Sequence, residues 1–544
     1  MRTANRLAVL AAPLLLAATS THAEPAAPGV THVLVIGIDG LSPEGIEISD
    51  TPHMRQLIRA GSWTINARAV LPTSSGANWA SMITGATPPQ HGVTSNEWAH
   101  DARTIEPADV GPEGIFPTIF GRVKAAHPDA RIAAIYEWGG FSPLCEKKPL
   151  TLDRHCSSPE QVADTALAWF AEGAPTLTFL HLDHVDITGH EQGWSSAPYI
   201  QAVERADAII GRLISGLRTH NLLESTAIIV TSDHGGIGNG HGGESMAELE
   251  IPWIISGPGI AQGRRILAPV NTEDTAATVA MLLGSTLTPA ATGRPVKAAL
   301  ASYQGPDVVA SPLVQRPKLG LPPGLHTTGT ITIPLSTRDA DVEIRYTTDG
   351  TPVTHQSPLY AAPVSLSKNG TLRARAYAKG GESAEAIGTY RVIAPDAPGG
   401  VRFERCAFPA TLGELRSIPD FSRLTPAETG VVPEIMLTEV LRRPVVAAAR
   451  FRGQITIPES GTWTFGVSSD DGVRVSVRGQ VVCEDEGRHG PRLRSGKTTL
   501  AAGTYDIVVE WFNGGGGAAL DVYWAGPGVP FQIIPTAALT PPKD

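Results

Sequence analysis

The residues with the clearest chemical potential lie in segment 71–79, LPTSSGANW, where an apolar strand end passes through Pro72 into hydroxyl side chains and then into a helical pattern. Ser75 is the candidate nucleophile in this segment. A serine hydroxyl is weakly nucleophilic at neutral pH and needs a general base or a metal ion to activate it. Taken alone, the segment fits an ordinary helix N-cap better. The role of Ser75 therefore depends on acidic and imidazole side chains elsewhere in the first half of the chain.

Such side chains follow three apolar segments. Segment 33–38 ends in an Asp-Gly pair, 177–182 leads into the sequence DHVDITGH, and 227–230 leads into TSDHGG, with a further histidine a few residues on. Any one of these residues alone is typical of a turn or a cap. Carboxylate and imidazole side chains without a nearby thiolate suit zinc or another divalent first-row ion, and there are enough of them here for two ions. The candidates are Asp39, Asp186, His190, Asp233, His234 and His241.

The elements that must position these residues indicate a mostly parallel sheet. Short apolar runs at 33–38, 132–136, 177–182 and 227–230 alternate with helical patterns such as 198–217, which has apolar residues at a spacing of three to four. Buried strands that alternate with helices predict an α/β domain whose sheet is covered on both sides. Ligands of such sheets bind outside the carboxyl ends of the strands, where the acidic and imidazole residues stand.

The ordered set of motifs resembles the alkaline phosphatase superfamily, in its nucleotide pyrophosphatase/phosphodiesterase branch, over roughly residues 30 to 290. The family's opening Asp-Gly matches Asp39-Gly40, and its Pro-Thr-x-Thr-x-x-Asn segment matches 72–78, with Ser75 in place of the nucleophilic threonine. Asp-x-x-x-His falls on 186–190, and Ser-Asp-His-Gly on 232–235. His241 matches the last histidine ligand, and Asn96 the phosphate-binding asparagine.

The resemblance implies two divalent metal ions, expected to be zinc. One would be held by Asp186, His190 and His241, and the other by Asp39, Ser75, Asp233 and His234. Ser75 would attack phosphorus to give a phosphoseryl intermediate, which water then hydrolyses. Asn96 and the backbone N–H of Gly76 would hold the non-bridging oxygens. Asp183 and His184 would either orient the ligands or be solvated turn residues.

Departures from the family pattern narrow the range of expected substrates. Relatives that cleave nucleotides carry aromatic residues where this chain has Gly76 and His181, so a nucleotide base is not the expected ligand. Trp98, Tyr136 and Trp138 could offer other stacking surfaces or simply pack. An asparagine instead of a phosphate-clamping arginine favours phosphodiesters. The alternatives are an alkaline-phosphatase-like phosphomonoesterase and a non-catalytic glycan-binding surface protein.

The rest of the chain indicates export and two further modules. Residues 1–23 have the pattern of a secretory signal peptide cleaved near Ala23, so we expect a periplasmic or extracellular protein. No other segment is apolar enough to span a membrane.

The catalytic domain would cover 24–303, followed by a Pro/Gly linker at 304–324. Residues 325–395 resemble the immunoglobulin-like C-terminal module of chitobiases, and 398–540 resemble the protective-antigen-type β-sandwich. The expected architecture is thus one α/β domain followed by two β-sandwiches.

The net charge, the cysteines and one pair of aspartates lead to three further expectations. The net charge of −10 argues against a nucleic-acid scaffold and against binding to anionic membranes. Four cysteines in an exported chain suggest disulfides, with Cys145–Cys156 and Cys406–Cys483 as the pairing that chain proximity favours. In the last module, Asp470 and Asp471 are a candidate site for Ca²⁺ and a sugar, although a tight turn is the interpretation we favour.

Overall fold

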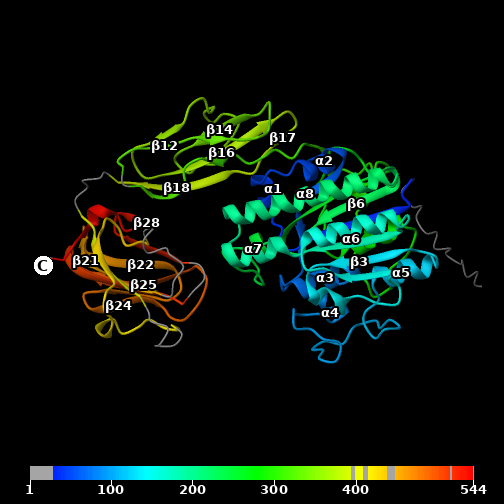
Figure 1. The fold of residues 1–544 in the computed structure, drawn as a ribbon. Helices are drawn as coiled ribbons and strands as arrows, with labels where there is room; N and C mark the ends of the chain where they lie inside the picture. The colour runs from blue at the N-terminus through cyan, green and yellow to red at the C-terminus, as the bar shows by residue number, and fades with distance from the viewer. Residues whose placement is uncertain are drawn as a thin grey trace, which may run out of the picture.

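The computed structural model describes residues 29–326, 328–393, 399–407, 415–437, 447–514 and 518–542. The signal-peptide prediction for residues 1–23 lies outside the described residues. Within them, no helix has both the length and the apolar character needed to cross a membrane. An α/β unit is followed by two units built from antiparallel strands, which confirms the expected multidomain fold class (Figure 1).

The first unit is built on a nine-stranded sheet with the order β4-β3-β5-β1-β6-β7-β2-β8-β9. The run from β4 to β6 is parallel throughout, whereas β7 is antiparallel to both of its neighbours. The ninth strand comes from the segment that the sequence predicted to be a linker. The bounds are β1 (His32–Ile38), β2 (Gly61–Arg68), β3 (Ile132–Tyr136), β4 (Leu152–His155), β5 (Leu177–Leu182), β6 (Thr226–Thr231), β7 (Glu250–Ser256), β8 (Arg264–Ile266) and β9 (Val308–Ala310).

Helices cover both faces of this sheet because alternate residues of each parallel strand are apolar on either side. One core contains side chains from α3, α5 and α10, and the opposite core contains side chains from α1, α2, α6 and α8. The bounds are α1 (Pro43–Ile48), α2 (Pro52–Ala60), α3 (Ser75–Thr84), α4 (Pro88–His91), α5 (Ile119–Ala126), α6 (Pro159–Ala171), α7 (His184–Gln192), α8 (Ala197–Thr219), α9 (Met246–Leu249) and α10 (Asp274–Leu282).

The carboxyl ends of the central strands β5, β1 and β6 meet at one edge of the sheet. In the register of the ladder, Ile38 lies opposite Leu182, and Gly37 lies opposite Thr231. The residues that follow these strands therefore start from the same level, although 140 to 200 residues of chain separate β1 from the other two. This alignment brings the candidate site residues into one place.

The middle unit is a small β-sandwich with an apolar core around Ile333, Leu372 and Tyr390. It docks on the first unit through charged side chains: Arg316 donates to Glu44 (2.6 Å) and also to Glu47, while Arg55 donates to the carbonyl of Leu313 (3.2 Å). The strands are β10 (Lys318–Leu319), β11 (Gly324–His326), β12 (Ile331–Ile333), β13 (Leu335–Ser336), β14 (Glu343–Thr347), β15 (Val364–Leu366), β16 (Gly370–Ala378), β17 (Gly381–Glu382) and β18 (Ala386–Val392).

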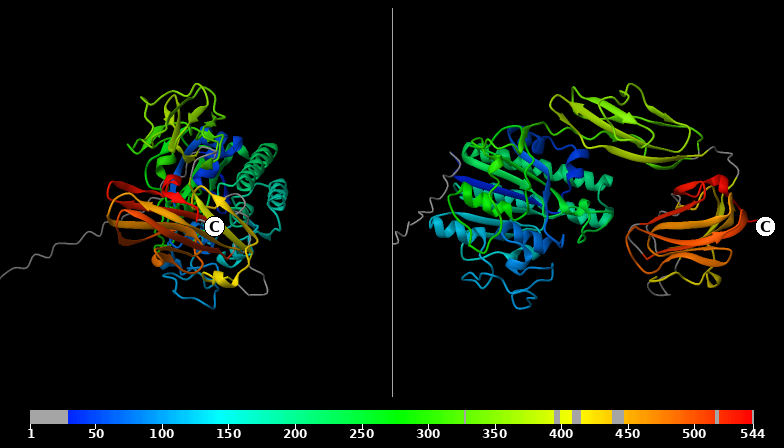
Figure 2. Two further views of the ribbon diagram at one scale, coloured as in Figure 1. Left: turned by 90° about the vertical axis from the view of Figure 1, so that its left-hand side faces the viewer. Right: turned by 180° about the vertical axis from the view of Figure 1, so that it is seen from behind.

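The C-terminal unit packs two antiparallel sheets around a core rich in tryptophan, including Trp463, Trp511 and Trp524. Both turned views show it next to the middle unit and on the same side of the first unit as α7 (Figure 2). The strands are β19 (Val401–Ala407), β20 (Glu428–Val432), β21 (Ala447–Ile457), β22 (Gly461–Asp470), β23 (Val473–Val477), β24 (Gln480–Asp485), β25 (Arg492–Leu500), β26 (Gly503–Asn513), β27 (Ala519–Gly526), β28 (Val529–Ile533) and β29 (Leu539–Thr540).

The disulfide prediction is wrong for this structure, in which all four cysteines are buried free thiols. Cys145 packs in the core on one face of the first sheet and Cys156 in the core on the other, so the sheet separates them. Cys406 on β19 and Cys483 on β24 are four strand positions apart in one sheet. That is about 19 Å at the usual strand spacing, far beyond the span of a disulfide.

In the C-terminal unit, Asp471 contacts two loops that are distant in the sequence. Its Oδ1 accepts from the backbone N–H of His489 and its Oδ2 from that of Gly514, both at 2.7 Å. Burial and the neighbouring Asp471 raise the pKa of Asp470 to about 7. Both oxygens of Asp471 thus accept from backbone N–H groups of two distant loops, and the tight-turn interpretation stays a prediction.

Candidate active site

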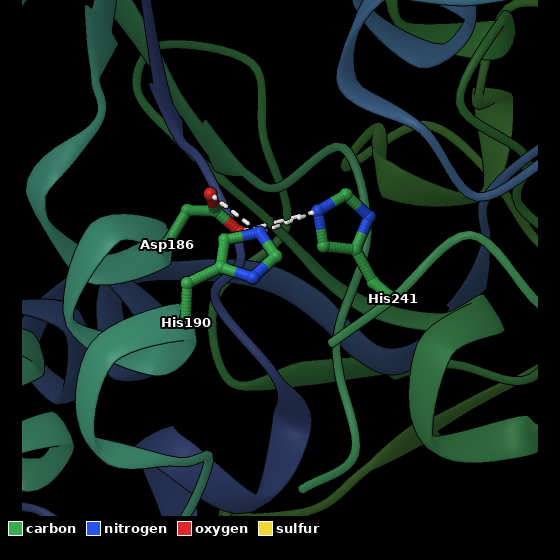
Figure 3. Close-up of side chains that lie close together, drawn as sticks. All are labelled: Asp186, His190 and His241. Carbon is green, nitrogen blue, oxygen red and sulfur yellow. Dashed lines mark hydrogen bonds and ion pairs between the residues drawn. The ribbon is translucent and has the colours of Figure 1, made fainter. Parts of the chain in front are cut away.

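The first group of converging side chains comes from α7 and from the loop after β6. Asp186 and His190 stand one helical turn apart on α7, so they share a face. His190 Nε2 lies 3.4 Å from Asp186 Oδ2, and His241 Nε2 lies 3.6 Å from Asp186 Oδ1. The two imidazole Nε2 atoms are 3.0 Å apart, so both rings point to one spot beside the carboxylate (Figure 3).

The second group lies at the ends of β1 and β6 and is fully buried. His234 Nε2 is 3.4 Å from Asp39 Oδ1 and 3.2 Å from Asp233 Oδ2. The other oxygen of Asp233 accepts from the backbone N–H of Gly40 (3.2 Å), and that of Asp39 accepts from the indole N–H of Trp79 (2.9 Å). These outer hydrogen bonds fix both carboxylates and leave one oxygen of each facing the imidazole.

Backbone carbonyls select the tautomer of all three histidines. The Nδ1 of His190 faces the carbonyl of Asn239 (2.9 Å), that of His234 the carbonyl of Gly235 (2.8 Å), and that of His241 the carbonyl of Thr73 (2.7 Å). A carbonyl can only accept, so each Nδ1 must carry the hydrogen and each Nε2 keeps a lone pair. These lone pairs point at carboxylate oxygens and, for His190 and His241, at each other.

Such an arrangement of acceptors is typical of a cation-binding site. Asp39 Oδ1, Asp233 Oδ2 and Asp186 Oδ1 are buried and have no hydrogen-bond donor. Burial, with the neighbouring Asp39 and Asp183, raises the pKa of Asp186 to about 9, while burial and His234 lower the pKa of His241 to about 3. Both sets of carboxylate oxygens and imidazole nitrogens therefore fit divalent ions of the zinc type, and Asp39, with His181 and Asp183, also belongs to a third group of possible ligands.

Ser75 lies beside the second group. It is the first residue of α3, it is buried, and its Oγ is 3.3 Å from His234 Nε2. The preceding Thr73 connects the segment to the loop that bears His241, since its hydroxyl donates to the carbonyl of Gly243 (2.7 Å). The segment that we identified as a possible N-cap thus places its second serine at the metal-type site, and Ser74 occupies the cap position.

Asn96 reaches the same helix end from a loop, in a way that differs from the expectation. The backbone N–H of Gly76 donates to Asn96 Oδ1 (2.7 Å), so it positions the asparagine rather than standing free for phosphate oxygens. This hydrogen bond leaves the Nδ2 amide hydrogens of Asn96 as the available donors. A Cβ at position 76 would lie 2.6 Å from the carbonyl oxygen of Ser95. Glycine is therefore required for the asparagine loop to approach.

Comparison with known proteins agrees with this geometry. Residues 33–243 match the family described as type I phosphodiesterase / nucleotide pyrophosphatase. This match lies within the first domain, which is called the phosphodiesterase-family domain from here on. Residues 321–389 match the chitobiase/beta-hexosaminidase C-terminal domain, and residues 447–536 match the PA14 domain.

Several curated proteins resemble the phosphodiesterase-family domain. Mouse ectonucleotide pyrophosphatase/phosphodiesterase family member 3 is 26% identical over 245 residues, which cover 41% of this chain and 27% of that protein. Venom phosphodiesterase of Macrovipera lebetinus is 27% identical over 215 residues, which cover 37% and 25%. The alignments thus span about a quarter of the length of these relatives. Bovine bis(5'-adenosyl)-triphosphatase ENPP4 is 26% identical over 214 residues, covering 37% and 47%.

Solved structures resemble parts of the chain more distantly. Murine ectonucleotide pyrophosphatase/phosphodiesterase 5 in complex with AMP shares 17% identity with a TM-score of 0.44, covering 50% of this chain and all of that one. An alkaline phosphatase, PafA, shares 11% identity with a TM-score of 0.41, covering 51% and 100%. A PA14 sugar-binding domain from an RTX adhesin shares 20% identity with a TM-score of 0.24, covering 27% and 100%.

His181 has a role in the phosphodiesterase-family domain that sequence reasoning missed. Its side chain is 0% exposed at the end of β5, and its Nε2 lies 3.1 Å from Asp39 Oδ2. Its ring packs edge-on against Trp79, with centroids 4.6 Å apart. It therefore supports Asp39 from behind and cannot stack on a substrate. The alternation of inward and outward residues in β5 was the signal that could have placed it.

Glu137 was also missed, and it organises the start of α7. Its carboxylate accepts from the backbone N–H of Asp183 (2.8 Å) and lies 3.8 Å from His184 Nδ1. His184 is buried, and its Nε2 faces the carbonyl of Ala202 (3.1 Å). These contacts bury His184, which argues against a solvated turn residue. Trp138, the residue after Glu137, is half-buried with its ring stacked near His181 at 6.3 Å.

Proposed function

We propose that this chain is an exported, two-metal phosphoric ester hydrolase in which Ser75 is the nucleophile. The observation that carries the proposal is the convergence of two sets of unpaired carboxylate oxygens and imidazole Nε2 atoms, with the Ser75 hydroxyl at the edge of one set. Asp186, His190 and His241 would hold one ion, and Asp39, Ser75, Asp233 and His234 the other. When bound, the two ions supply Lewis-acid stabilisation of the oxygens that attack and leave.

The chain's own residues account for the covalent chemistry. The Ser75 Oγ attacks phosphorus and gives its proton to water, the bond from phosphorus to the leaving oxygen breaks, and the leaving oxygen takes a proton from water. The phosphoseryl ester is then cleaved by water, which restores the hydroxyl and releases the phosphate product. Because Ser75 begins α3, the positive end of the helix favours the negative phosphoryl group.

The preferred substrate is a phosphodiester. The amide of Asn96 is a neutral donor, oriented by Gly76, and it suits the single negative charge of a diester better than the two charges of a monoester. Since His181 is buried behind Asp39 and position 76 has no side chain, neither can hold a base by stacking. The competing hypothesis is an alkaline-phosphatase-like monoesterase. The preference for diester or monoester substrates distinguishes the two hypotheses.

The first experiment compares three p-nitrophenyl substrates at equal concentration, with the mature protein and zinc. They are the phosphate monoester, bis-p-nitrophenyl phosphate and a nucleoside monophosphate p-nitrophenyl diester. We expect the simple diester to have the highest kcat/KM and the nucleoside diester to gain nothing from its base. A monoester preference would overturn the diester assignment. Absence of hydrolysis of all three, with two metals bound, would favour the non-catalytic reading.

The appended modules suggest where the enzyme acts. The PA14 match, together with an exported chain, supports retention near carbohydrate-rich material outside the cytoplasm. The segment that leads into the middle sandwich is held to the first domain by the ion pairs of Arg316 with Glu44 and Glu47.

A further inference from the structure

A cavity of about 1060 Å³ lies between the two C-terminal units, outside the phosphodiesterase-family domain. Its walls come from β18 and the β15–β16 turn of the middle sandwich and from β27 and β28 of the last one. The volume exceeds that of most sites for drug-sized molecules. It is large enough for a ligand of several linked rings.

An ion-pair clamp holds the two walls together. Arg391 of β18 reaches Glu434 Oε2 and Asp521 Oδ1, each at 3.2 Å. Arg391 and Glu434 are largely buried, so this contact is desolvated and directional, unlike an exposed surface pair. The cavity therefore has a defined shape set by both modules.

One wall continues into an aromatic surface. The rings of Tyr523 and Phe531 stack with centroids 5.1 Å apart and an angle of 9° between their planes. Phe531 is 47% exposed, and it can lie flat on the sheet because Gly466 lies beneath it, where a Cβ would be 2.7 Å from its ring. Large flat rings held open to solvent beside a polar cavity are placed for contact with a ligand that has both apolar and polar faces.

The charges around the cavity define the kind of ligand. Lys368 and Arg391 are its cations, and Asp349, Glu434 and Asp521 are its anions. Since Arg391 is already paired with two of these carboxylates, no cationic surplus remains for a polyanion such as nucleic acid or an acidic polysaccharide. Neutral polar side chains, among them Asn369 and Gln532, supply further donors and acceptors.

We propose that this cavity and the Tyr523–Phe531 surface form a binding site for a neutral oligosaccharide. Sugar rings have apolar faces that pack on aromatic rings and hydroxyls that bond to amide and carboxylate side chains, which matches the lining. The site needs both modules, and it is separate from the Asp470-Asp471 turn. It does not depend on hydrolysis by Ser75.

Affinity electrophoresis of the full chain tests the site. The protein carries a net charge of −10 and migrates in native gels, so retardation by polysaccharide in the gel reports binding. The probes are hydroxyethylcellulose, galactomannan and glycol chitin as neutral polymers, and alginate as the polyanion. We expect retardation in at least one neutral gel and none in alginate. Retention by alginate alone, or no retardation in any neutral gel, would overturn the proposal.

Variants localise the binding. Tyr523→Ala and Phe531→Ala should each weaken retardation by at least about tenfold in apparent affinity. Val481→Ala, which removes an exposed side chain from β24 of the other sheet, should leave it unchanged. Arg391→Ala should weaken binding by separating the walls, while the unfolding temperature of the catalytic domain and the hydrolysis of small phosphoesters stay as in the parent. Binding that persists in both aromatic variants would refute the site.

Discussion

The imidazole rings of His234 and His241 stack nearly parallel, with centroids 3.6 Å apart and 18° between their planes. Each ring belongs to a different group of metal-type ligands, so this contact joins the two groups into one centre. His234 follows a central strand, whereas His241 lies on a loop that is tied to Thr73 in front of the nucleophile. The Ser75 hydroxyl lies 3.3 Å from the His234 Nε2, on the second group of this centre.

Replacement of one histidine should remove one metal ion. In His241→Ala the first group keeps only Asp186 and His190, so we expect bound zinc to fall from about two equivalents to about one. Inductively coupled plasma mass spectrometry after gel filtration measures the ratio. His155→Ala is the matched control, since this histidine is exposed and contacts only a backbone carbonyl and a tyrosine ring. Two equivalents in His241→Ala would contradict the ligand assignment.

Loss of the nucleophile should abolish turnover while the fold survives. Ser75→Ala removes only an oxygen beside His234, so kcat should drop at least about 10³-fold with little change in unfolding temperature. Ser74→Ala is a close control, because the neighbouring hydroxyl is buried without a hydrogen-bond partner. Steady-state hydrolysis of bis-p-nitrophenyl phosphate, with metal content measured in parallel, checks both. Equal losses in the two variants would mean that Ser75 has no special role.

The contact between Gly76 and Asn96 should matter for transition-state binding. Asn96→Ala removes the oriented amide donor, and we expect kcat/KM for a diester to fall about 10²-fold. Gly76→Ala should cause a comparable loss, because its Cβ would meet the Ser95 carbonyl and displace the loop. Gly139→Ala is the control, because this glycine has no positive φ and its Cβ would come no closer than 3.8 Å to the His155 side chain. A fully active Gly76→Ala protein would show that the asparagine position is unimportant.

The metal-free protein should lose stability as the pH rises. Burial raises the pKa of Asp39 and Asp233 well above their usual range and that of Asp186 to about 9, so the folded state binds these protons more tightly than the unfolded chain. Their stabilising contribution is complete below the pKa of the unfolded chain and is lost as the pH approaches 9. Zinc binds the deprotonated groups, so its stabilising effect should grow over the same range.

Differential scanning fluorimetry in EDTA and in zinc, from about pH 7 to 9, measures this trend above the range in which the lowered pKa of buried histidines such as His241 gives the opposite dependence. Asp186→Asn is the control without one of the carboxyl groups, and its metal-free unfolding temperature should depend less on pH. A metal-free parent protein that is equally stable across the range, or more stable at high pH, would contradict the expected linkage.

Much of the fold could be predicted from the periodic spacing of apolar residues in the sequence. The apolar runs at 132–136 and 177–182 coincide with β3 and β5, and the predicted helix at 198–217 lies within α8. Buried parallel strands are short, apolar and followed by polar turns, so they can be recognised locally. The disulfides could not be predicted in this way, because which face of the sheet a cysteine occupies depends on packing between distant segments.

The sequence by itself determined which residue types form the site and in which order they occur. They are three strand-end motifs, one serine segment and a final histidine. The alternation of strands and helices also determined that the sheet is mostly parallel. Only the tertiary structure decided how they act. The tautomers of His190, His234 and His241 depend on carbonyls of separate segments, the burial of His181 on the two cores, and the orientation of Asn96 on one backbone N–H of α3. These properties arise from contacts between residues far apart in the chain, which local patterns do not encode.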